Sequence, residues 1–97
     1  MRNIPISPIP NQSLSVRLDD QRLVLRLKEA NGVMVADVER NGVSVVRGTR
    51  VLAGEFVIPY QYQQVGNFML LTTGDDLPDW SEFGATQTLV YFEAAEL

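Results

Sequence analysis

Three carboxylates lie close together in this 97-residue chain, Asp75, Asp76 and Asp79. Carboxylates at such spacing could hold a hard cation. Two acids facing each other across a cleft could instead cleave a glycosidic bond. The EF-hand pattern is absent, however, and Pro78 interrupts the spacing. We therefore interpret these residues as a solvated loop whose carboxylates favour a turn and the start of a short helix.

Aromatic side chains are the second group that could bind a ligand. Trp80 and Phe83, together with Tyr60, Tyr62 and Tyr91, could form a stacking platform for sugars or bases, which would make the chain a small β-rich ligand-binding module. Alternatively, Trp80 fills the core of the domain. The stretch from Tyr60 to Gln64 suits a protein interface, because Tyr supplies contact area and Gln supplies adaptable hydrogen bonds. We predict that Tyr60 and Tyr62 contact a partner.

The composition argues against catalysis. The chain has no Cys and no His, which excludes a thiolate nucleophile, a Ser-His-Asp triad and a histidine or cysteine metal site. We therefore expect no enzyme activity, no cofactor and no metal. Its 8 Lys and Arg stand against 12 Asp and Glu, giving a net charge of −4, so direct binding to nucleic acid is not expected. The sequence has no apolar run long enough to cross a bilayer, so no membrane contact is expected.

The elements that must position these side chains are predicted to be strands. Between residues 13 and 47 apolar and polar residues alternate with a period of two. Asn31-Gly32 and Asn41-Gly42 separate alternating segments, and the Asn-Gly pair favours the type I′ turn of a two-residue hairpin. The pattern predicts a four-stranded antiparallel meander.

The register of the meander follows from its turns. Two-residue Asn-Gly loops pair Leu25 with Val38 and Val38 with Val45, and a four-residue loop over 19–22 pairs Leu18 with Leu23. One face then collects the apolar residues Leu14, Val16, Leu18, Leu23, Leu25, Leu27, Met34, Ala36, Val38, Val43 and Val45. Arg26 lies opposite Asp37 on the other face, unless a longer loop at 29–32 moves that pair.

The second half of the chain predicts further strands at 51–60, 68–73 and 86–93, the first with a bulge or corner because Gly54 and Pro59 interrupt it. A loop over 74–80 and a helical turn after Pro78 are also predicted. The expected fold is therefore all-β, a small single-domain antiparallel β-barrel or sandwich of about six to seven strands. Residues 13–97 would form this domain, and residues 1–12 an extended arm.

The arm alternates apolar residues with prolines, which fix φ and remove N–H donors. Its conspicuous residues are Ile4, Pro5, Ile6, Pro8, Ile9 and Pro10. Two interpretations are open. The isoleucines could fold back onto the domain's own core, or the arm could dock on a neighbouring subunit. We predict partner contacts for all six residues. Because the prolines interrupt any apolar stretch of the length a secretory signal needs, we expect synthesis in a cytoplasm.

Three segments together resemble a known family. They are residues 4–16, Leu70-Leu71-Thr72-Thr73 leading into Leu77-Pro78-Asp79-Trp80, and Phe83-Gly84 preceding Leu89-Val90-Tyr91-Phe92. They are similar to small phage tail proteins typified by the cyanophage baseplate plug. The resemblance implies a non-enzymatic structural component of a contractile phage tail, located in the virion at or inside the baseplate hub, that mediates virion assembly. The implied partners are hub, tube and spike proteins and further copies of the same chain.

Overall fold

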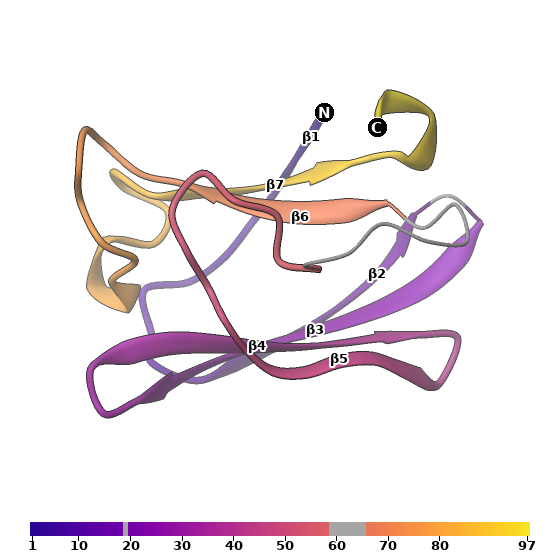
Figure 1. Cartoon of the computed structure of the whole chain (residues 1–97), viewed down its shortest axis with the longest axis horizontal. Coiled ribbons are helices and arrows are strands. Elements are labelled where there is room, and N and C mark those ends of the chain that lie inside the picture. The colour runs from indigo at the N-terminus through magenta and orange to yellow at the C-terminus, as the bar shows by residue number, and fades with distance from the viewer. Residues whose placement is uncertain (19, 59–65) are drawn as a thin grey trace.

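The computed structural model describes residues 1–18, 20–58 and 66–97 and shows two antiparallel sheets facing each other (Figure 1). The four-stranded sheet has the order β2 (Gln12–Leu18), β3 (Gln21–Ala30), β4 (Val33–Arg40) and β5 (Val43–Arg50). The three-stranded sheet has the order β1 (Arg2–Ile4), β7 (Thr88–Phe92) and β6 (Asn67–Leu71). Two short 3-10 helices, η1 (Trp80–Glu82) and η2 (Ala94–Glu96), complete the described elements. The all-β prediction is confirmed, as an open sandwich.

Both Asn-Gly turns form as expected. Asn31 and Asn41 have φ of 52° and 51°, and Gly32 and Gly42 both have φ of 84°. Two successive residues with positive φ match the twist of the strands on either side. Across the first turn, β3 and β4 pair Leu25 with Val38, as predicted.

Two details of the predicted register are wrong. Leu18 pairs with Gln21 and not with Leu23, so the β2–β3 connection is two residues long. Asp20 makes the tighter turn possible with φ of 58°, which Asp tolerates better than most side chains. Because the shift is by an even number of residues, the apolar face is unchanged.

The other error lies in β5. Val38 pairs with Val46 and not with Val45, and a second register shift follows before Ala36 pairs with Thr49. Gly48, with φ of 65°, lies within this irregular stretch. Its N–H donates to Asp37 Oδ1 at 2.6 Å, so a side chain of β4 takes the place of a regular ladder partner.

The core lies between the two sheets. The four-stranded sheet contributes Leu18, Leu23, Leu25, Leu27, Met34, Ala36 and Val38, all predicted to face inward and all at most 5% exposed. The opposite sheet contributes Phe68, Leu70, Leu89 and Tyr91. Val43 is the exception to the predicted face. It begins β5 beside the Asn41-Gly42 turn and is 67% exposed.

The segment after β5 is not the strand that the sequence predicted. Over residues 51–58 only two isolated bridges form, Ala53 with Leu70 and Phe56 with Met69. Gly54 adopts φ of 70° between them, which interrupts an extended conformation. The predicted helical turn after Pro78 is confirmed as η1.

The N-terminal residues supply a strand that the sequence did not predict. β1 pairs with β7, and Ile4 lies opposite Leu89. Ile4 is 3% exposed and belongs to the core. A three-residue strand that pairs with the far end of the chain has no local sequence signature.

Candidate functional site

The exposed part of the N-terminal arm is a compact turn over residues 7–11, which we call the leader turn. Ile9 N donates to the Ser7 carbonyl at 2.8 Å. The Gln12 side chain closes the turn, because its Nε2 donates to the Ser7 carbonyl at 2.7 Å and its Oε1 accepts from Ser7 N at 3.0 Å. Ile9 is 45% exposed at the centre of this turn, between the exposed Pro8 and Pro10.

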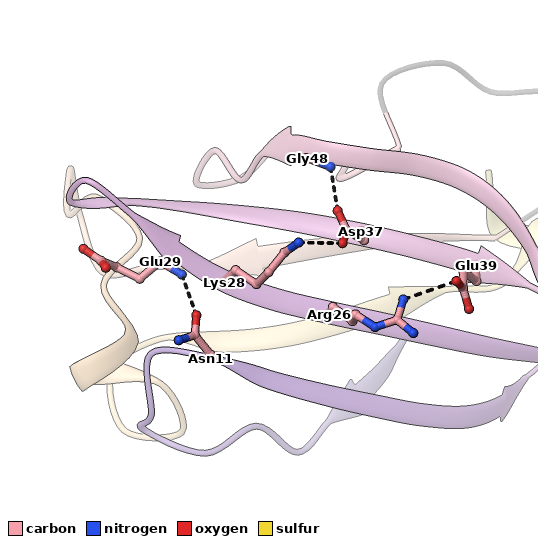
Figure 2. Close-up of polar contacts among 7 residues, drawn as sticks. All are labelled: Asn11, Arg26, Lys28, Glu29, Asp37, Glu39 and Gly48. Carbon is pink, nitrogen blue, oxygen red and sulfur yellow. Dashed lines mark hydrogen bonds and ion pairs between the residues drawn. The ribbon is translucent and has the colours of Figure 1, made fainter.

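A second contact ties the leader turn to the four-stranded sheet. Asn11 Oδ1 accepts from the Glu29 backbone N–H at 3.2 Å, near the end of β3 (Figure 2). Together with the Gln12 contacts, this bond fixes both flanks of Ile9. The leader turn is thus an ordered apolar projection on the surface of the domain.

The predicted partner-binding residues are distributed over three environments. Ile4 is in the core and Ile6 is half-buried against it, so in this fold they anchor the arm to its own domain. The prolines at 5, 8 and 10 and Ile9 are exposed. Tyr60 and Tyr62 lie outside the described residues. A partner role for the exposed residues stays a prediction.

Asn67 bonds to Ile58, the last described residue before Tyr60 and Tyr62. Its side chain is 1% exposed and pairs with the backbone of Ile58. Oδ1 accepts from Ile58 N at 2.9 Å, and Nδ2 donates to the Ile58 carbonyl at 3.0 Å. Oδ1 also accepts from Phe68 N at 2.9 Å. The amide group thus imitates a strand partner where Ile58 has no regular ladder.

The outer face of the four-stranded sheet carries diagonal ion pairs (Figure 2). Arg26 lies directly opposite Asp37, as predicted, but its guanidinium contacts Glu39 at 3.3 Å. Lys28 Nζ donates to Asp37 Oδ2 at 2.7 Å, while Gly48 N–H donates to Oδ1. The Lys28 ammonium, followed by the Gly48 N–H, holds the pKa of Asp37 below its ordinary value.

The acidic loop does not bring its three aspartates together as ligands. Asp79 Oδ1 accepts from Ser81 N at 3.0 Å and caps η1, which confirms the helix-start interpretation for this residue. Asp75 and Asp76 are exposed. Within the described residues, no group of three or more acidic, His or Cys side chains could hold a metal ion.

A shallow groove of about 800 Å³ runs beside this loop, and the half-buried Trp80 lines it. Trp80 also packs against the core. Tyr91, proposed above as a stacking neighbour, is fully buried and packs edge-on against Phe68 with ring centroids 5.1 Å apart. Tyr91 is therefore not available for an aromatic platform.

Two buried polar side chains that organise the loops were missed by the sequence reasoning. Asn67 is one. Gln87, also 1% exposed, donates from Nε2 to the Leu77 carbonyl at 2.9 Å and accepts from Asp79 N at 2.9 Å. Gln87 lies within the predicted strand 86–93, where a polar residue at an inward position is the available signal, whereas Asn67 precedes the predicted strand 68–73. The partners of both side chains are backbone groups of loops, which no local pattern reveals.

Comparison with known proteins decides the family. The sequence matches the family model described as cyanophage baseplate Pam3 plug gp18 over residues 1–94. The chain belongs to this baseplate plug family. The predicted resemblance is thereby confirmed, and with it a structural role in a phage tail baseplate. No curated protein sequence matches the chain significantly. In the described part of the chain, no helix has the length and apolar character needed to cross a membrane.

Proposed function

We propose that this chain is a non-catalytic component that plugs or caps the baseplate hub and joins the virion through its leader turn. Hub, tube or spike proteins, or further copies of the chain, would bind this turn. The chain would be made in the host cytoplasm and then built into the tail. Membership of the plug family supports the location, and the leader turn supplies the surface.

The observation that carries the proposal is the exposure of Ile9 on an ordered support. Single exposed apolar residues are common on protein surfaces and need no explanation. Ile9 differs because prolines flank it and side-chain hydrogen bonds to Ser7 and Glu29 hold the turn. A preorganised apolar projection loses little conformational entropy on binding, so most of the burial free energy is available to the complex.

The first residues of the arm explain how the leader turn can bind a partner while the arm stays attached to its domain. Ile4 in the core and Ile6 against it fasten the arm to the domain. Docking therefore needs no release of the arm. Tyr60 and Tyr62 stay predicted contacts of the same kind.

The test replaces Ile9 with Asp and measures incorporation into baseplates assembled from the other tail proteins. Full burial of an isoleucine contributes about 1.5–3 kcal/mol, and Ile9 is already about half-buried, so docking gains about 0.7–1.4 kcal/mol from it. Replacement with Asp also places a carboxylate in the interface, so the affinity should fall at least about tenfold. The matched control is Val43→Asp, which also removes an exposed aliphatic residue. We expect Val43→Asp to incorporate normally.

Both variants should keep the wild-type urea unfolding midpoint, since neither residue is in the core. Baseplates that accept Ile9→Asp as readily as the wild type would exclude the leader turn as the docking element.

A further inference from the structure

The edge of the sandwich formed by β2 differs from its other edges. Unpaired strand edges attract further strands, and proteins usually block them. Of the four strands that border the described sheets, β5 is interrupted by two register shifts. β6 is covered by the segment before it, because Gly54 N donates to the Leu70 carbonyl and Val57 N to the Phe68 carbonyl, both at 2.9 Å. β1 has only three residues, and Pro5 follows it.

β2 has none of these protections. It is seven residues long, contains neither Pro nor Gly, and pairs with β3 one to one along its whole length. Among the described residues, no backbone hydrogen bond joins its outer side to another segment. Leu14 and Val16 remain half-exposed along this edge, although they face the core side.

The backbone groups that point outward can be assigned. Arg22 bonds to Asn41 on the β4 side, where its carbonyl accepts from Asn41 N at 2.8 Å and its N–H donates to Asn41 Oδ1 at 2.9 Å. The Arg17–Arg22 pair is therefore a non-hydrogen-bonded pair of the β2–β3 ladder. Because such pairs alternate with bonded ones, Ser13, Ser15 and Arg17 direct their N–H and C=O groups to the open edge.

The same edge has an unbalanced charge. Arg17 and Arg22 lie directly opposite each other, and like charges in this position destabilise a sheet. Non-hydrogen-bonded pairs bring side chains closest together, which increases the repulsion. In the described part of the chain neither guanidinium has a carboxylate partner; Arg22 Nε donates only to Ser15 Oγ, at 3.4 Å.

We propose that β2 receives an extended segment of another tail protein as a fifth strand, with a carboxylate of that segment beside Arg17. The open N–H and C=O groups supply the ladder, and the carboxylate relieves the arginine pair. A second copy of β2 fits less well, because it would add another Arg17 to an edge that already carries two arginines. The inference deepens the proposed function, since it names a partner's chemistry at a surface distinct from the leader turn.

Synthetic peptides test the edge directly. The probe is a seven-residue peptide of sequence Val-Glu-Val-Thr-Val-Glu-Val. A second peptide carries Lys in place of both Glu residues. At low ionic strength we expect the glutamate peptide to bind the full-length chain about tenfold more tightly than the lysine peptide. On binding, amide exchange of Ser13, Ser15 and Arg17 should slow. Equal binding of both peptides, or no binding, would overturn the proposal.

Two variants separate edge pairing from general stability. Ser15→Pro removes an outward N–H and no β2–β3 hydrogen bond, so it should fold and lose the peptide. Its control, Ser15→Ala, loses the same contact with Arg22 but keeps the N–H, and should bind normally. Arg17→Glu places a carboxylate opposite Arg22, so the unfolding midpoint of this variant should not fall. The variant should bind the lysine peptide more tightly than the glutamate peptide. Unchanged peptide binding by Ser15→Pro would contradict edge pairing.

Sedimentation and assembly assign the occupant. If the wild type forms a dimer that Ser15→Pro abolishes, the edge serves a second copy and the proposed acidic partner is wrong. If wild type and Ser15→Pro enter baseplates equally well, the edge proposal fails while the baseplate role stands. If the wild type does not enter baseplates but the peptide results hold, the proposed function and the tail protein as occupant fail, while the pairing of β2 with an acidic strand stands.

Discussion

The side chain of Asn67 should be among the most costly to remove in this domain. Replacing it with Ala leaves the N–H and C=O of Ile58 and the N–H of Phe68 without these partners at buried positions. An unsatisfied buried backbone group costs about 1–3 kcal/mol. Three such groups, largely relieved by relaxation and entry of water, predict a loss of about 2–4 kcal/mol in the free energy of unfolding.

Urea unfolding followed by the fluorescence of Trp80, the only tryptophan in the chain, provides the measurement. With a slope of about 1–1.5 kcal/mol per molar urea, the midpoint should fall by about 1–4 M. Amide exchange adds a local readout, since the Ile58 N–H should lose its protection.

The control is Asn11→Ala, which removes one bond at an exposed position and should cost no more than about 0.5 kcal/mol. A loss below about 0.5 kcal/mol for Asn67→Ala, with the Ile58 amide still protected, would show that the buried amide bonds contribute nothing net.

Two further predictions concern stability. The low pKa of Asp37 means that its ionised form stabilises the fold above its ordinary pKa of 3.8, and that this contribution is lost as the pH falls through the lower folded value. Asp37→Asn should therefore lower the free energy of unfolding by about 1–2 kcal/mol at neutral pH, a modest value because Lys28 is half-exposed. In urea titrations at acid pH the difference from wild type should shrink, and a difference that stays constant with pH would contradict this. Gly66→Ala would drive a methyl group into the Tyr91 phenol and to 2.5 Å from the Phe92 carbonyl oxygen, so we expect a loss of at least about 1–3 kcal/mol in calorimetry, where an unchanged melting temperature would refute the packing argument.

The parts of the fold that could be predicted are those with local causes. The Asn-Gly turns depend on the φ tolerance of two adjacent residues, and the inward face of the meander depends on alternation. The irregularity of β5 has no such cause. Val45 and Val46 are adjacent and both apolar, so alternation does not say which one pairs with Val38, and both pack partly against the core. Gly48, which donates to Asp37, lies in the same irregular stretch.

The candidate site was less predictable for a related reason. Its ordered loops depend on bonds between buried amide side chains and backbone groups many residues away. Asn67 bonds Ile58 across the segment 59–65, and Gln87 bonds Leu77 and Asp79. An amide side chain can pair with any free backbone group, so its residue type carries little information about its partner.

The N-terminal arm shows how the two interpretations of its isoleucines can both describe one segment. Some isoleucines of the arm pack into the chain's own core, and another is exposed and available to a neighbour. Ile4 pairs opposite Leu89 and is buried, whereas Ile9 projects from the leader turn. The prolines favour this division, since each lacks a backbone N–H donor and fixes its own φ. An exposed turn that is held between β1 and β2 can contact a partner without any unfolding of its own domain, which is what the proposed docking in the baseplate requires.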